Sequence, residues 1–291
     1  MWIIMSLMSA FFAGITSILA KCGIRKIGSN VAMAIRTIII LIFSLLIVFI
    51  SGSFNLIHNI TPKSLIFLLL SGVVTGVSWL FYFKAVFIGD LNKVAAIDKS
   101  SVVLSILFAI VLFKETDKLL IKLIGIVLIL IGTIFMLERK QRYKDIKNNI
   151  YIVYAILSAI FAALTSILGK IGIDNIGIDN IDSNLATLIR TFVILIISWI
   201  IIIVTKEYKS IFKIDRRELI FISLSGISTG ASWLCYYYAI KNGIVSLVIP
   251  IDKLSIVVVV AFSYIFFNEK LSKISFIGLI FIVFGTIIMT F

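Results

Sequence analysis

The sequence LSGVVTGVSWL at Leu70–Leu80 returns as LSGISTGASWL at Leu224–Leu234, and this repetition decides how the rest of the chain is interpreted. The match continues in nearly constant register on both sides, so that residues 11–136 are written a second time between residues 160 and 289. The period is roughly 150 residues, which is far too long for a solenoid repeat. The chain therefore consists of two domain-sized copies.

Each copy is almost wholly apolar. Hydrophobic residues make up 61% of the 291 and the mean hydropathy is +1.20, whereas about half of a soluble domain is apolar. We find ten stretches long enough to cross a bilayer, beginning near residues 2, 31, 64, 90, 119, 150, 184, 219, 244 and 271. Uncharged runs such as residues 38–57 favour helices over the alternating strands of a barrel. The sequence predicts an all-α integral membrane protein.

Five spans in each copy carry the chain across the membrane an odd number of times. The second copy then starts on the opposite side, which predicts ten transmembrane helices arranged as two inverted five-helix repeats. The expected units are residues 1–137, a basic linker at 138–149 and residues 150–291. Inverted repeats permit alternating access around a site near the midplane. The alternative is a duplication that only enlarged a helix bundle, as in some intramembrane enzymes and channels.

The net charge of +13 indicates membrane topology rather than a nucleic-acid partner, because the basic residues are spread over short loops. Loops after odd-numbered spans contain 16 Lys and Arg residues, and the opposite loops contain six. The positive-inside bias places the richer side in the cytoplasm. We therefore expect a multi-pass protein of the cell membrane with a cytoplasmic linker at 138–149 and both termini outside.

Metal or cofactor chemistry has no support in the sequence. Cys22 and Cys235 belong to no spaced cluster and are expected to be thiols without a redox or metal role. The single histidine, His58, lies in a loop, so neither a zinc site nor a histidine-based catalytic set is predicted. We expect no cofactor and no metal.

The predicted spans contain more positive than negative side chains. The basic residues within spans are Arg36, Lys84, Lys99, Arg190 and Lys253, and the acidic ones are Asp98 and Asp252. A charge inside a membrane is costly unless it faces a partner or an aqueous cavity, so each is a candidate functional residue. The positive excess favours an anionic or zwitterionic substrate.

The adjacent pairs Asp98-Lys99 and Asp252-Lys253 are the strongest candidates for substrate binding. Each lies about nine residues into its span, or roughly 13 Å, near the middle of a ~30 Å apolar core. Neighbouring side chains on a regular helix diverge by about 100°. We therefore expect Asp98 near Lys253 and Asp252 near Lys99. The alternative is an ion-pair lock that only joins helices.

Other candidates come in matched positions. Pro250 is expected to kink or unwind the ninth span, with or without a ligand role, and the first copy has Ala96 there. Arg36 and Arg190 are equivalent and suit either gates or snorkelling to the headgroups. Glu115 and Glu269 are expected to cap helices or pair with loop lysines. Two aromatic faces suit ligand stacking or an interfacial belt; they comprise Trp79, Tyr82 and Phe83, and Trp233, Tyr236 and Tyr237.

With these features the chain resembles the EamA-type transporters of the drug/metabolite transporter superfamily over nearly its whole length. The resemblance rests on the two five-span copies, on LFKE at 112–115 and FFNE at 266–269, and on Pro250. Glycines in the fifth and tenth spans fit the same pattern, namely Gly125, Gly132, Gly278 and Gly285. The family implies secondary carriers, often exporters, of amino acids, sugars, nucleotide derivatives or organic cations. Small multidrug relatives use a glutamate in their first helix, which residues 1–20 and 150–169 lack.

The sequence thus predicts a secondary active transporter, not an enzyme, for a small anionic or zwitterionic metabolite that resembles an amino acid. Its expected partners are this substrate, membrane lipid and, as a candidate coupling ion, the proton. One alternative is an exporter of aromatic or cationic drug-like compounds, bound by the aromatic faces. Another is an intramembrane enzyme that modifies lipid, which would need a polar catalytic set near the headgroups.

Overall fold

A computed structural model describes residues 1–24, 28–113, 118–137, 150–173, 182–242, 248 and 251–289. All regular structure within these ranges is helical. In the first copy the helices are α1 (Trp2–Gly23), α2 (Ser29–Ile50), η1 (Ser53–Asn59), α3 (Pro62–Ile88), α4 (Leu91–Lys99), α5 (Ser101–Phe113) and α6 (Leu119–Met136). In the second they are α7 (Ile150–Ile173), α8 (Ser183–Val204), η2 (Glu207–Lys213), α9 (Arg216–Asn242), α11 (Ser255–Phe267) and α12 (Lys273–Ile288).

Seven of the described helices are long and apolar enough to cross a membrane, namely α1, α2, α3, α6, α7, α8 and α9. The predicted fourth span is divided at Ser100 into α4 and α5, and α12 is a shorter apolar helix. Of the predicted ninth span, the structure describes Val248, residues 251–253 and α11. An all-helical, multi-pass architecture is confirmed, and the expectation of an uninterrupted fourth span is corrected.

Polar side chains mark where several helices begin. Thr61 accepts a hydrogen bond from the backbone N–H of Ser64, and Pro62 occupies the first turn of α3. Asp90 accepts from the backbone N–H groups two and three residues later at the start of α4. Ser272 caps α12 in the same manner, with 3.0 Å to the N–H of Ser275. These caps satisfy amides that have no partner within the helix.

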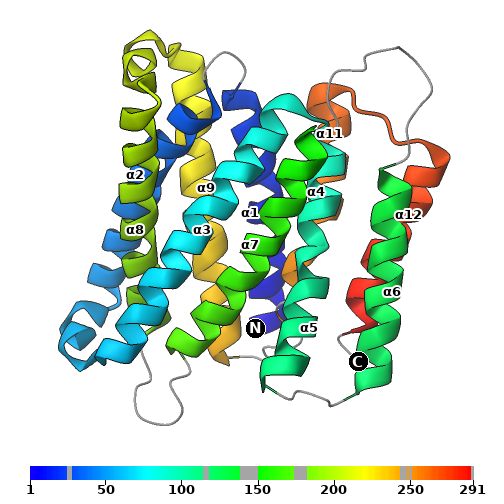
Figure 1. The fold of residues 1–291 in the computed structure, drawn as a ribbon, viewed down its shortest axis with the longest axis horizontal. Helices are drawn as coiled ribbons and strands as arrows, with labels where there is room; N and C mark the ends of the chain where they lie inside the picture. The colour runs from blue at the N-terminus through cyan, green and yellow to red at the C-terminus, as the bar shows by residue number, and fades with distance from the viewer. Residues whose placement is uncertain are drawn as a thin grey trace.

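The helices of one copy pack mainly against helices of the other. α1 lies along α9, α3 lies along α7, and α2 contacts α8, as the interleaved colours of Figure 1 show. Serine hydroxyls tie these pairs together in matching positions: Ser78 donates to the carbonyl of Ser158 at 2.9 Å, and Ser232 to that of Ser9 at 3.1 Å. The two halves therefore form one interlocked bundle.

Glycines allow α6 and α12 to approach closely. A Cβ atom added to Gly132 would lie 2.5 Å from the carbonyl oxygen of Gly278, and one added to Gly278 would lie 2.6 Å from that of Gly132. Gly125 and Gly285 face one another in the same reciprocal manner. Because Gly125 meets Gly285 and Gly132 meets Gly278, the two helices run in opposite directions. Small residues at such contacts are typical of membrane helix packing.

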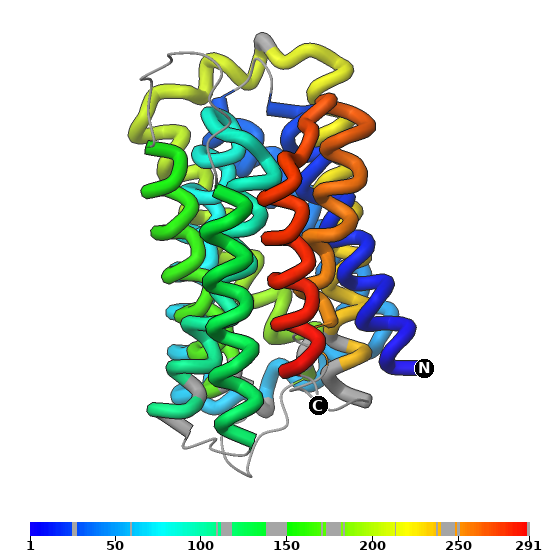
Figure 2. The backbone as a smooth tube through the Cα atoms, turned by 90° about the vertical axis from the view of Figure 1, so that its right-hand side faces the viewer, coloured from blue at the N-terminus to red at the C-terminus, as the bar shows by residue number. Residues whose placement is uncertain are grey.

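The outer surface of the bundle is apolar, and several polar side chains are buried inside it. Leu120, Ile134 and Ile265 expose more than three-fifths of their surface, while Ser9 and Ser225 are fully buried. Large apolar side chains on the outside suit contact with lipid. The start of α1 and the end of α12 lie at one end of the bundle (Figure 2), and the end of α6 and the start of α7 lie at the other.

Candidate functional site

Both Asp-Lys pairs lie directly before a break in their helices. α4 ends at Lys99, where the Ser100 amide turns to the carbonyl of Ile97 at 3.0 Å, and α5 begins one residue later. In the second copy residues 251–253 are helical, a turn follows at Leu254, and α11 begins at Ser255. Ser100 and Leu254 are equivalent positions of the repeat. The interruption is thus a feature of both copies.

Both copies are interrupted, although only the second has a proline two residues before its aspartate. Pro250 itself lies outside the described residues, but the first copy breaks although it has Ala96 at that position. The hydroxyl of Ser100 donates to the carbonyl of Ile97 at 2.6 Å, which occupies an acceptor that a continuing helix would use. A proline is therefore not required for the break in the first copy.

The pairing of the charges also differs from the prediction. Lys99 Nζ lies 3.4 Å from the Oδ2 of its own neighbour Asp98, whereas the ion pairs of the described residues do not include Asp98 with Lys253 or Asp252 with Lys99. The expectation was that adjacent side chains on a helix point too far apart to pair, but the long side chain of Lys99 reaches the carboxylate of Asp98 at the end of α4. Lys253 still experiences the charges of Lys99, Asp98 and Asp252. The four groups gather where α4 packs against α11.

Asp252 accepts a hydrogen bond from a serine of α1, which in turn contacts a serine of α9. Ser9 Oγ of α1 donates to Asp252 Oδ1 at 2.6 Å, and the same hydroxyl lies 3.2 Å from Ser232 Oγ of α9. Both serines are buried. The carboxylate of the second half therefore has a direct partner from the first half, and no lysine lies within ion-pair distance of it among the described residues.

Arg36 points into the bundle rather than toward the headgroups, so the snorkelling alternative is wrong for this residue. Its side chain is 5% exposed, and its Nη2 donates to Thr229 Oγ1 of α9. The guanidinium carbon lies 4.9 Å from the centroid of Trp79 and 4.7 Å from that of Phe83, both on α3. Arg36 thus joins α2 of the first half to α9 of the second.

Arg190 makes the equivalent contact in the other copy. Its Nη2 donates to Thr75 Oγ1 at 3.1 Å, and Thr75 in turn donates to Thr165 at 3.2 Å. The corresponding distance between Thr16 and Thr229 is 3.4 Å. The predicted equivalence of the two arginines is therefore visible in their partners, although Arg190 is only half-buried.

The two predicted aromatic faces meet inside the protein. The rings of Trp79 and Trp233 lie 5.7 Å apart at an interplanar angle of 34°. Tyr82 donates its hydroxyl hydrogen to Ser17 Oγ at 2.9 Å. Tyr236 is half-buried on α9, and the side chain of Tyr237 lies outside the part that the structure describes. Contact between the tryptophans favours an interior role over an interfacial belt for this pair.

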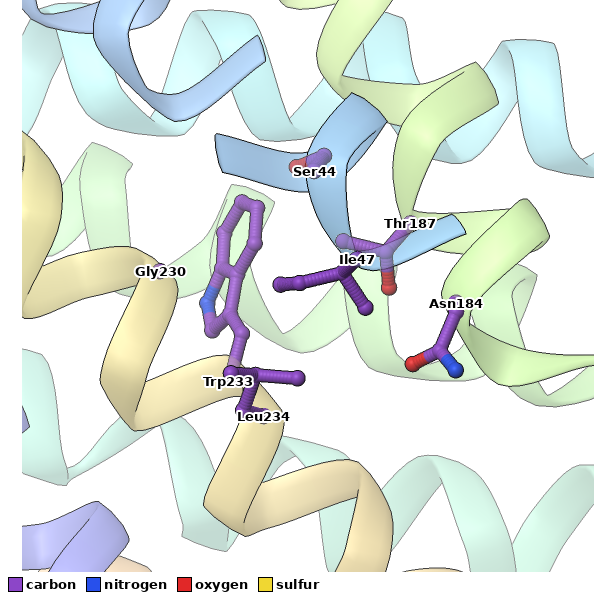
Figure 3. Close-up of a pocket in the computed structure, with 7 residues that line it drawn as sticks. All are labelled: Ser44, Ile47, Asn184, Thr187, Gly230, Trp233 and Leu234. Carbon is purple, nitrogen blue, oxygen red and sulfur yellow. The ribbon is translucent and has the colours of Figure 1, made fainter. Parts of the chain in front are cut away.

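A small pocket borders Trp233. Figure 3 shows it between α2, α8 and α9, and its lining comprises Ser44, Ile47, Asn184, Thr187, Gly230, Trp233 and Leu234. Most of this lining is apolar, with two hydroxyl groups and one amide. One tryptophan of the pair, Trp233, therefore borders a small cavity, which the sequence did not predict.

A buried ion pair joins the end of α1 to the segment that follows α11. Lys21 Nζ lies 2.7 Å from Glu269 Oε1 and also donates to the carbonyl of Gly89 at 3.2 Å. Both side chains are more than four-fifths buried. This confirms the expectation that Glu269 pairs with a lysine, whereas Glu115 lies outside the described residues.

The remaining charged residue of the predicted spans, Lys84, is exposed, and its ammonium lies 4.8 Å from the ring centroid of Tyr154. Lys84 therefore lies at the surface of the bundle. Sequence reasoning missed the hydroxyl partners Ser9, Ser17 and Thr229. A signal existed for all three, since they recur in the other copy as Ser158, Ser166 and Thr75. Among the described residues no group of His, Cys, Asp or Glu is arranged to hold a metal ion.

Comparisons with known proteins agree with this architecture. The model of the EamA-like transporter family matches residues 1–138 and again residues 149–291. An uncharacterized transporter of a Sinorhizobium species is 43% identical over 136 residues, which are 47% of this chain and 93% of that protein. An uncharacterized protein of Methanocaldococcus jannaschii is 29% identical over 89 residues, 31% of this chain and 65% of that protein. A solved crystal structure with 15% identity has the same fold, with a TM-score of 0.69 over 99% of this chain and 95% of that one.

Proposed function

Because the chain belongs to the EamA-like transporter family, we propose that it is a secondary active transporter of a small anionic or zwitterionic metabolite, similar to an amino acid. The observation that carries the substrate class is the gathering of charged groups at the matching helix breaks, where α4 meets α11. Interrupted helices at the junction of two repeats are typical of carrier binding sites. The charges beside these interruptions suit a polar ligand.

Alternating access is the mechanism that we propose for it, with the two matched segments as inverted repeats. Three reciprocal sets of contacts support this arrangement: the serine pairs of α1 with α9 and α3 with α7, the arginine–threonine pairs, and the glycines of α6 and α12. When each contact has a counterpart in the other half, exchanging the conformations of the halves produces a second state of similar energy. Substrate would then face one side and the other in turn.

We further propose that the linker 138–149 is cytoplasmic and that both termini are outside. The positive-inside bias of the loops carries the sidedness, and the position of both termini at one end of the bundle is consistent with it (Figure 2). Trypsin added to intact cells is expected to spare the basic linker and to remove a tag at residue 1. Cleavage of the linker in intact cells would reverse this orientation.

Reconstitution into liposomes tests the proposed function directly. Vesicles with the protein are expected to take up a radiolabelled mixture of the common L-amino acids in a saturable manner, faster than protein-free vesicles. An inward proton gradient is expected to accelerate the uptake if Asp98 or Asp252 carries the coupling proton. Uptake no faster than in protein-free vesicles would contradict the proposed substrate class, and indifference to the gradient would contradict the coupling.

The contact between Trp79 and Trp233 beside the pocket of Figure 3 favours a second candidate, an exporter of aromatic or cationic compounds. The two functions differ in which substitution is the more damaging. Lys253→Ala is expected to reduce amino-acid uptake more than Trp233→Ala. The reverse order, together with transport of tetraphenylphosphonium, would favour the second candidate.

Neutralising Glu269 is expected to open the end of the bundle that Lys21 and Glu269 close. A buried partner worth about 1.4 kcal/mol corresponds to a tenfold change in an equilibrium, so the Glu269→Gln variant should expose the neighbouring buried thiol of Cys22 about ten times more often. The measurement is the rate of N-ethylmaleimide labelling in a Cys235→Ser background.

Two further variants control this experiment. The charge-exchanged double variant Lys21→Glu/Glu269→Lys should restore slow labelling, because it restores the ion pair. Lys270→Gln removes an exposed charge next to Glu269 and should label like the unmodified protein. Labelling of Glu269→Gln at the unmodified rate would show that the pair does not hold this end closed.

A further inference from the structure

We infer that Arg36, rather than the lysines of the Asp-Lys pairs, binds the carboxylate of the transported substrate. This inference rests on the proposed function, and it names the residue of the transporter that binds the anionic group of the substrate. Arg36 lies on α2 at the junction of both halves, with Thr229 of α9 on one side and Trp79 and Phe83 of α3 on the other. It is 5% exposed and therefore removed from both water and lipid headgroups.

The balance of charges separates Arg36 from the lysines. The cluster at the helix breaks contains two carboxylates and two ammonium groups, and Lys99 lies 3.4 Å from Asp98 within it. Lys253 is affected by both carboxylates as well as by the like charge of Lys99. Arg36 has no carboxylate within ion-pair distance among the described residues, and it interacts electrostatically with the neutral phenol of Tyr82. A buried cation without an anion is costly, and the carboxylate of a ligand would remove that cost.

The hydrogen bonds of Arg36 leave it able to accept a ligand. Thr229 donates its own hydroxyl hydrogen to the carbonyl of Ser225 at 2.9 Å, so its oxygen serves Arg36 only as a neutral acceptor. Nε of Arg36 is buried and has no hydrogen-bond partner among the described residues. A guanidinium offers five donors in a planar fork that matches a carboxylate bidentately. The contacts with the rings of Trp79 and Phe83, which lie at 82° to one another, restrict the movement of the guanidinium.

The surroundings specify the ligand class further. Tyr82 lies close enough to interact electrostatically with both Arg36 and Asp98. A small molecule with a carboxylate at Arg36 would therefore extend past the Tyr82 hydroxyl toward Asp98. That geometry fits a carboxylate ligand with a polar or cationic second group, which is the class of amino and hydroxy acids.

Thermal unfolding of the detergent-solubilised protein tests the assignment with a simple probe. Sodium benzoate is expected to raise the melting temperature of the unmodified protein, and neutral benzamide at matched ionic strength is not. Arg36→Met should abolish the benzoate effect. Arg190→Met, the substitution at the equivalent position of the other copy, should retain it. An undiminished benzoate effect in Arg36→Met, or none in the unmodified protein, would overturn the inference.

The ligand-free variants separate a binding arginine from a structural one. If Arg36 is kept for binding, replacing an uncompensated buried cation by an apolar side chain of similar length should leave the melting temperature without benzoate unchanged or higher. A larger fall for Arg36→Met than for Arg190→Met would assign Arg36 a structural role and overturn the inference. Arg36→Lys provides a further test, because it keeps the charge and loses the fork. We expect it to bind benzoate at least about tenfold more weakly, and unchanged affinity would contradict bidentate recognition.

The proposed function can fail independently of this site. If the unmodified protein binds benzoate through Arg36 but vesicles show no uptake of any amino acid, the anion site is supported and the proposed substrate class is contradicted. If uptake is found and Arg36→Met transports as fast as the unmodified protein, the function stands and the assignment of Arg36 falls.

Discussion

Asp98→Asn is expected to lower the free energy of unfolding by about 2–3 kcal/mol, since removing one member of a largely buried ion pair leaves the other uncompensated. The side chain of Lys99 is 13% exposed and lies 3.4 Å from Asp98. Without this carboxylate, the cluster at the helix breaks would hold two ammonium groups and one acid. The measurement is the shift in melting temperature and in the denaturant midpoint of the protein in detergent.

The double variant Asp98→Asn/Lys99→Met distinguishes an ion-pair lock from a lost contact of another kind. Removing both charges should recover most of the stability lost in Asp98→Asn, because no uncompensated ammonium group remains at Lys99. Asp215→Asn, at an exposed position before α9, serves as the matched control and should change stability by less than about 0.5 kcal/mol. If the double variant is no more stable than Asp98→Asn, the pair does not compensate its own charges.

Gly278→Val is expected to separate α6 from α12 and to reduce stability by about 3 kcal/mol or more. Even the first added carbon, Cβ, would lie 2.6 Å from the carbonyl oxygen of Gly132 and 2.9 Å from the backbone nitrogen of Met136. Backbone atoms cannot rotate away as a side chain can, so the helices must move apart and lose their packing. Thermal unfolding in detergent, followed by size-exclusion chromatography, measures the loss.

A matched glycine without this constraint provides the control for Gly278. A Cβ atom added to Gly169 would meet Ser71 Oγ at 3.5 Å and Arg190 Nη1 at 3.6 Å, which are ordinary contacts. The first copy already has Ala20 at the equivalent position. Gly169→Ala should therefore unfold within about 0.5 kcal/mol of the unmodified protein. Equal losses for Gly169→Ala and Gly278→Val would refute the role assigned to the close approach of α6 and α12.

Much of the fold was predictable because the repeat and the hydrophobic runs are long-range patterns that survive any local uncertainty. Seven predicted spans correspond to long helices that begin within three residues of the expected positions. The break at Ser100 was not predictable in this way, since residues 91–113 contain no proline or glycine to indicate where the helix is interrupted. Both copies are interrupted directly after their Asp-Lys pair, although one has Ser100 and the other Leu254 at that position.

The residues of the candidate site were predictable from the sequence, but their partners were not. Asp98, Lys99, Asp252 and Lys253 stand out in the sequence because charges are rare within apolar spans, and they do come together. Their partners did not follow from spacing, because adjacent side chains diverge along a helix, yet the long side chain of Lys99 still reaches Asp98. Hydroxyl partners such as Ser9 are too common in membrane helices for their role to be recognised without the fold.

The sequence by itself determined that this chain spans the membrane several times in two related halves, because the hydrophobic effect and the repeat act through composition and order alone. Tertiary structure alone decided which charges are compensated. Asp98 meets Lys99 at the end of α4, whereas Arg36 meets aromatic rings and a threonine from other helices. The physical reason is that electrostatic compensation depends on distances between helices far apart in the chain, which no spacing within one helix encodes.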